Sequence, residues 1–193
     1  VIVLYALLPF FMAFEGRKPE VRELVVLATM IALATAGRAA FFMTPSFKPI
    51  IAIVIISAIA FGAEAGFLVG SMTMLVSKFL FGQGPWTPWQ MFAMGFIGFF
   101  SGILYRLRIL PTKRLQLSVY GFLVTFMIYG GIMNPAALFM SVYQFSWSGL
   151  LAIYISGVPV DLVHASSTFL FLWIGAKPLL EKLQRIKVKY GLL

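Results

Sequence analysis

The sequence contains no cysteine, one histidine and only six carboxylates among its 193 residues. Without cysteine the chain has neither disulfides nor thiolate ligands, and a single histidine excludes a metal site made of several histidines. The scattered carboxylates argue against an acidic cage for a cation. The P-loop motif, the HExxH zinc motif and an evident catalytic triad are also missing from the sequence. We therefore expect no enzymatic activity, no cofactor and no resident metal.

Charge is scarce as well, because 11% of the residues are charged and 61% are hydrophobic, with a mean hydropathy of +0.98. Soluble domains have about 25% charged residues, so this composition is typical of a membrane protein. The net charge of +9 is interpreted as a signal for orientation in the lipid bilayer and not for binding nucleic acid.

Seven apolar segments predict an all-α, polytopic transmembrane helix bundle. They cover residues 1–14, 24–43, 49–63, 65–81, 88–106, 115–133 and 159–177. The first one lacks an initiator methionine, and we expect it to be the end of a membrane helix whose start is truncated. Residues 134–158 are also apolar but are interrupted by Asn134–Pro135 and by Gly157–Val158–Pro159. This stretch is interpreted as a partly helical connection at the outer interface, with an eighth span as the alternative.

Basic residues suggest the orientation of the bundle. Twelve of the fifteen Lys and Arg residues fall within residues 17–22, 106–114 and 177–189. Seven spans place these three groups on one side, which the positive-inside rule makes cytoplasmic. The C-terminus is then cytoplasmic, and the remaining cations, Arg38, Lys48 and Lys78, lie at or toward the outer end.

The expected outer connections are rich in glycine, proline and aromatic residues. The most distinctive is "FGQGPWTPWQM", residues 81–91, which carries Trp86, Trp89 and Gln90. Two tryptophans at an interface often form only an anchoring belt. A belt does not need the interspersed glycines and prolines, whereas a shaped loop that caps a pocket does. We expect a binding site that opens outward.

Alanine recurs every four residues at Ala28, Ala32 and Ala36, a spacing that stacks small side chains along one face of a helix. Small residues allow close backbone approach between membrane helices. The stripe therefore predicts either packing against a neighbouring helix of the same chain or a docking face for another membrane protein.

Three ionisable residues are candidates for function. Arg38 either snorkels to the interface or points inward toward an anionic or polar ligand group. Asp161 and His164 share a helix face at a spacing of three. Asp161 is expected to cap the start of the last helix, while a proton relay is the weaker alternative.

Together these residues resemble a known family, the substrate-binding S components of energy-coupling factor (ECF) transporters, which import vitamins in prokaryotes. The resemblance is carried by the alanine stripe, a core of six helices, the loop "FGQGPWTPWQMF" and the closing "DLVHASSTFLFLWIGAKPLLEKLQRIK". It covers about residues 22–187, which we expect to form a six-helix S-component membrane domain, with residues 1–14 as an additional N-terminal helix. Within the family the cobalamin-specific components are the most similar.

The resemblance implies that the chain binds a vitamin, as transported substrate, at the outer face of a prokaryotic cell membrane. It also implies that the chain delivers the vitamin with a coupling transmembrane subunit and two ATP-binding subunits, with Ala28, Ala32 and Ala36 facing the coupling subunit. Aromatic residues would stack on the ligand and polar residues would bind its edges. The candidate contacts are Arg38, Phe42, Lys48, Trp86, Trp89, Gln90, Tyr129, Asn134, Tyr143, Asp161 and His164.

Other hypotheses remain open at this point. The ligand is cobalamin or another vitamin such as riboflavin, pantothenate or a queuosine-type compound. An ion-coupled secondary transporter needs buried acids, for which Asp161 is the only candidate. A structural membrane subunit without a ligand is a further alternative.

Overall fold

A computed structural model describes residues 2–16, 20–141 and 145–191, and these ranges form helices and no strand. The elements are α1 (Ile2–Gly16), α2 (Val21–Ala40), α3 (Ile50–Phe61), α4 (Ala63–Phe81), α5 (Thr87–Arg106), α6 (Arg114–Val124), η1 (Thr125–Tyr129), α7 (Gly130–Ser141) and α8 (Trp147–Tyr190). Because α6, the π-helical turn η1 and α7 follow one another without a break, they act as one helix over Arg114–Ser141. The predicted all-α membrane bundle is confirmed.

Within the described ranges, four helices are long and apolar enough to cross a bilayer, namely Val21–Ala40, Ala63–Phe81, Arg114–Ser141 and Trp147–Tyr190. Helix α3 is shorter, with 12 residues, and every one of them is buried. A helix that is apolar on all sides belongs in the centre of a bundle, and α3 accordingly packs against α2, α4, α5 and α8.

Glycines bring the backbones of α4 and α5 into contact. A Cβ atom added at Gly98 would lie 2.2 Å from the carbonyl oxygen of Gly66, and one added at Gly70 would lie 2.4 Å from the carbonyl oxygen of Met94. In the sequence, Gly62, Gly66 and Gly70 recur four residues apart, a spacing that predicts tight packing, and the contacts of Gly66 and Gly70 confirm it.

Residues 134–158 differ from the sequence-based interpretation. Helix α7 continues through Pro135 to Ser141, and α8 begins at Trp147, where the Ser146 Oγ accepts a 3.1 Å hydrogen bond from the Gly149 amide. The described part of this stretch is therefore the end of one helix and the start of the next. It is more helical than expected, and it forms no separate helix that could be an eighth span. Membrane helices tolerate internal proline when neighbouring helices and side chains satisfy the freed carbonyl groups.

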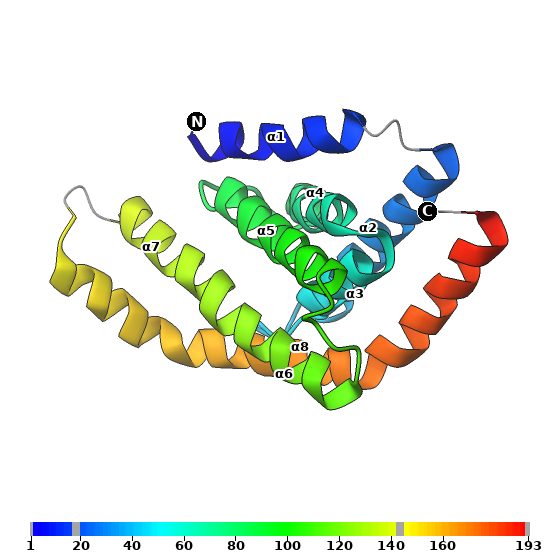
Figure 1. The fold of residues 1–193 in the computed structure, drawn as a ribbon. Helices are drawn as coiled ribbons and strands as arrows, with labels where there is room; N and C mark the ends of the chain where they lie inside the picture. The colour runs from blue at the N-terminus through cyan, green and yellow to red at the C-terminus, as the bar shows by residue number, and fades with distance from the viewer. Residues whose placement is uncertain (1, 17–19, 142–144, 192–193) are drawn as a thin grey trace.

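The last helix is consequently much longer than predicted, with 44 residues that include Pro159 and Pro178. The expectation that Asp161 caps its start is wrong, because Asp161 lies four turns inside α8. Figure 1 shows α8 curving beneath the bundle from the left end, where α7 ends and α5 begins, to the right end near the C-terminus. Figure 1 also shows α1 lying across α4 and α5, where the ring of Phe10 stacks on Phe67 with 4.0 Å between centroids.

Candidate functional site

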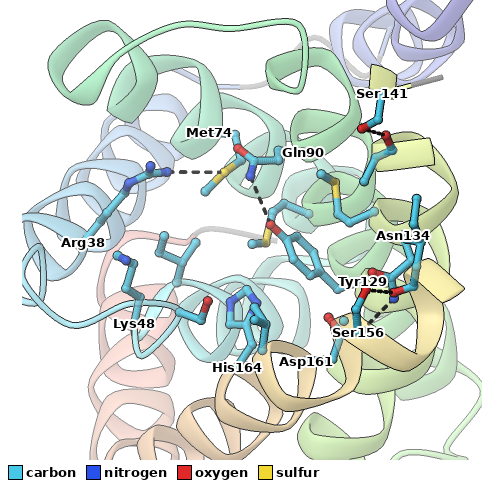
Figure 2. A pocket seen from close by; sticks show the side chains of 18 residues that line it. Arg38, Lys48, Met74, Gln90, Tyr129, Asn134, Ser141, Ser156, Asp161 and His164 are labelled. Atoms are coloured by element: carbon cyan, nitrogen blue, oxygen red, sulfur yellow. Dashed lines mark hydrogen bonds between the residues drawn. The ribbon is translucent and has the colours of Figure 1, made fainter. Parts of the chain in front are cut away.

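A cavity of about 520 Å³ lies between α2, α4, α5, the α6–α7 helix and α8, near the end of the bundle where α2 ends and α5 begins (Figure 2). Seven of the side chains proposed from the sequence line it. They are Arg38, Lys48, Gln90, Tyr129, Asn134, Asp161 and His164. These residues lie up to 126 positions apart in the chain, so the fold gathers polar groups that the sequence spreads over six segments.

Arg38, in the last turn of α2, reaches into this cavity. Its Nη1 donates to the Oγ of Ser77 at 3.2 Å and lies 3.8 Å from the Sδ of Met74. The guanidinium also lies 5.8 Å from the ring centroid of Phe81. Its Nε is buried and has no hydrogen-bond partner among the described residues. Arg38 therefore points inward and does not snorkel, and one of its donors is available to a ligand.

Lys48, in the loop between α2 and α3, lies on the same side of the cavity as Arg38 (Figure 2). The loop is held in place because Ser167 of α8 donates a 2.9 Å hydrogen bond to the Lys48 carbonyl oxygen. The Nζ of Lys48 donates to the Thr44 carbonyl oxygen at 3.2 Å. Burial lowers the pKa of Lys48 from its ordinary value, and the positive charge of Arg38 lowers it further.

Gln90, Tyr129 and His164 form a second group in the cavity. The Nε2 of Gln90 donates to the hydroxyl of Tyr129 at 3.3 Å, and the Tyr129 ring meets the His164 ring edge to face at 4.6 Å. The Oε1 of Gln90 is buried without a hydrogen-bond partner among the described residues. Buried polar atoms are normally satisfied, so this acceptor is free to bind a donor group of a ligand.

Asn134 and Asp161 form a third group on the opposite side, where the Nδ2 of Asn134 donates to the Oδ2 of Asp161 at 2.8 Å. Two glycines make room for this pair. A Cβ added at Gly157 would lie 2.6 Å from the Oδ1 of Asn134, and one added at Gly130 would lie 2.7 Å from the Oδ2 of Asp161. The π-helical turn η1 precedes Gly130 directly, and such turns recur at functional sites because they shift the side chains that follow.

The remaining candidate residues lie elsewhere. Phe42 is 54% exposed and stacks on Phe81, whereas Trp86 covers the turn at Gly84 and faces Lys78, whose Nζ lies 5.5 Å from its ring. Phe42, Trp86 and Trp89 do not line the cavity. Tyr143 lies outside the described residues.

Sequence reasoning missed an apolar part of the cavity wall, to which Met74, Met94 and Met133 contribute. Methionine in an apolar helix gives no signal that separates a ligand contact from ordinary packing. Its flexible, polarizable side chain adapts to flat or irregular ligands. Ser46 and Ser156 also line the cavity without having been predicted.

The alanine stripe lies on the opposite side of α2 from the core. Ala28, Ala32 and Ala36 are all exposed, while Leu27, Met30 and Ala34 are the apolar residues that α2 buries. Packing against another helix of this chain, one of the two alternatives, therefore does not account for the stripe.

A comparison with protein-family models places the chain among known proteins. Residues 18–185, most of the chain, match the family model described as "ECF-type riboflavin transporter, S component". Neither a curated protein nor a solved structure matches the chain.

Proposed function

The chain belongs to the family of ECF-type riboflavin transporter S components, and on that premise we propose that the cavity in Figure 2 is the site where it binds its vitamin. Members of this family are membrane-embedded, substrate-binding subunits for vitamin uptake, and they work with ECF coupling and ATPase modules. The protein is thus a vitamin-uptake subunit of the membrane, whose own role is to bind the substrate.

The observation that carries the proposal is the gathering of ionisable and hydrogen-bonding side chains around one cavity. Arg38, Asp161 and His164 all belong to apolar helices and all line it. Ionisable groups inside membrane helices are costly and mark substrate pathways. A structural subunit without a ligand gives no reason for collecting them.

The size of the cavity favours a vitamin no larger than a flavin. Its volume of about 520 Å³ lies in the range of roughly 300–1,000 Å³ typical of sites for drug-sized ligands. Riboflavin, to which the family description refers, is of that size, and its flat ring suits a wall made of Tyr129, His164 and methionines. Cobalamin, the vitamin predicted from the sequence, is far larger, and neither the volume nor the family description supports it.

For delivery, we propose that the exposed face of Ala28, Ala32 and Ala36 docks on the coupling subunit. Alanine allows close helix approach without interlocking side chains, which suits a partner that binds and leaves. The basic groups and the C-terminus lie on the cytoplasmic side of a prokaryotic membrane, and the cavity lies toward the outer side. Two ATP-binding subunits supply the energy.

Mass spectrometry of the molecules retained by the purified protein, followed by titration with riboflavin, pantothenate and cobalamin, tests this proposal. Ala137→Trp fills the cavity from α7 and is expected to abolish binding. The matched control is Leu123→Trp, because Leu123 is 49% exposed on α6 and does not line the cavity. Equal binding by both variants would place the vitamin elsewhere, and the absence of any retained or bound vitamin would reject the proposal.

A further inference from the structure

The cavity has an uneven distribution of charge. Arg38 and Lys48 lie on one side, and Asp161 is the only carboxylate among the described residues that line it. Figure 2 shows Asp161 across the cavity from Arg38, next to Asn134, to which it is hydrogen-bonded. The two cations therefore face the cavity without an acidic partner between them.

This arrangement is costly for the empty protein. Two like charges at a partly buried site repel each other, and the repulsion is stronger than in water because the surroundings are apolar. The contacts of Arg38 with Ser77 and Met74 both use Nη1, and its Nε remains unpartnered. A structural role for Arg38 would be expected to satisfy these donors with protein groups.

An anionic group on the ligand would offset the repulsion between Arg38 and Lys48. It would also accept hydrogen bonds from the incompletely partnered Arg38 guanidinium. We propose that the molecule bound in this cavity carries a carboxylate or phosphate group, held between Arg38 and Lys48. This inference rests on the proposed function, since it names the class of ligand that the same cavity takes.

The rest of the cavity fits a ligand that is anionic at one end only. Beyond the two cations come Met74 and Tyr129, and then the Asn134–Asp161 pair (Figure 2). An anion near Asp161 would be repelled, whereas hydroxyl or amide donors would be accepted there. Among flavins, the arrangement favours riboflavin 5′-phosphate over riboflavin, and among other vitamins it favours those with a single carboxylate.

Pairs of ligands that differ only in the anion test the inference, namely riboflavin 5′-phosphate with riboflavin, and pantothenate with its alcohol, pantothenol. Isothermal titration of the detergent-solubilised protein is expected to show that the anionic member of at least one pair binds about 10- to 100-fold more tightly, the range given by one or two charge-assisted hydrogen bonds. The pair that shows the preference identifies phosphate or carboxylate as the anion.

Substitutions connect the preference to the two cations. Arg38→Gln is expected to remove most of the preference, measured as the ratio of the two affinities within each pair. Lys48→Gln, in the loop between α2 and α3, provides a second variant whose folding is less at risk. Arg22→Gln is the matched control, because Arg22 lies on the same helix at its other end and is expected to keep the preference.

Equal affinities within both pairs would overturn the inference, and so would a preference that survives both Arg38→Gln and Lys48→Gln. In either case vitamin binding itself still supports the proposed function. If no member of either pair binds and the purified protein retains no vitamin, the proposed function fails together with the inference.

Discussion

Asn134 donates a 2.8 Å hydrogen bond to Asp161 between two helices, although the residues are 27 positions apart in the chain. Both side chains are at most 9% exposed, and both line the cavity. This bond joins α7 to α8 at the wall of the proposed site, so we expect both ligand binding and the stability of the fold to depend on it.

Replacing Asn134 with leucine removes the donor and leaves the Asp161 carboxylate buried. We expect a loss of about 1–3 kcal/mol in the free energy of unfolding and weaker vitamin binding. Unfolding in detergent micelles and ligand titration measure the two effects. Asp161→Asn preserves an acceptor oxygen for Asn134 and is therefore expected to lower the free energy of unfolding by less than Asn134→Leu does. A larger loss for Asp161→Asn than for Asn134→Leu would show that the hydrogen bond does not hold the helices together.

Asp161→Asn also separates the proposed function from ion-coupled transport. If the chain delivers its vitamin with ATPase partners, uptake into cells depends on active ATPases, and Asp161→Asn reduces uptake only as far as it reduces binding. Radiolabelled uptake with wild-type and ATPase-inactive partners measures this. Uptake that persists with inactive ATPases but disappears in Asp161→Asn would instead support secondary transport.

Gly157 lies against Asn134, so adding one methyl group there tests the geometry of the cavity. Gly157→Ala places a Cβ 2.6 Å from the Oδ1 of Asn134, which displaces the amide and is expected to weaken ligand binding about tenfold, equal to roughly 1.4 kcal/mol. Gly175→Ala is the matched control on the same helix, because a Cβ there meets no atom within 4 Å. Similar affinities for the two variants would mean that the Asn134 position is unimportant for binding.

The exposed alanine face predicts that docking and binding are separable. Ala32→Trp or Ala36→Trp projects a large side chain away from the bundle, so vitamin affinity is expected to stay within about twofold of wild type while association with the coupling subunit and uptake are lost. Pull-down with the coupling subunit and ligand titration give the two readouts. Ala13→Trp, at an exposed site on α1, serves as the control, and normal association of the Ala32 and Ala36 variants would exclude this face as the docking surface.

The lowered pKa of Lys48 predicts a pH dependence for the binding of an anionic ligand. Burial and the charge of Arg38 disfavour the protonated amine in the empty cavity, so its charge is present at low pH and is lost as the pH rises through that lowered pKa. Affinity for the anion is therefore expected to fall toward alkaline pH, beginning below the ordinary lysine range. Lys48→Arg keeps its charge and is expected to remove this decline; an unchanged pH profile would exclude Lys48 as a ligand contact.

Much of this protein follows from the sequence alone, because a bilayer imposes simple rules on composition and length. Segments of apolar residues must be helical in lipid, since no water is available to satisfy their backbone groups. The membrane class, the all-α fold, the close approach at Gly66 and Gly70 and the choice of Arg38 and His164 as candidate residues all came from such local reasoning. The extents of α7 and α8 did not, because Asn134–Pro135 in α7 and Pro159 in α8 favour breaks in an isolated chain, whereas packing against neighbouring helices allows them inside a helix.

Tertiary structure alone decided which way each side chain faces. A spacing of four aligns Ala28, Ala32 and Ala36 on one side of a helix, but only the position of α2 in the bundle turns that side outward and Arg38 inward. The sequence likewise did not reveal that Trp86 of the α4–α5 turn and Trp89 of α5 do not line the cavity, or that methionines line it. Facing direction depends on contacts between helices that are distant in the chain, and a local pattern contains no information about them.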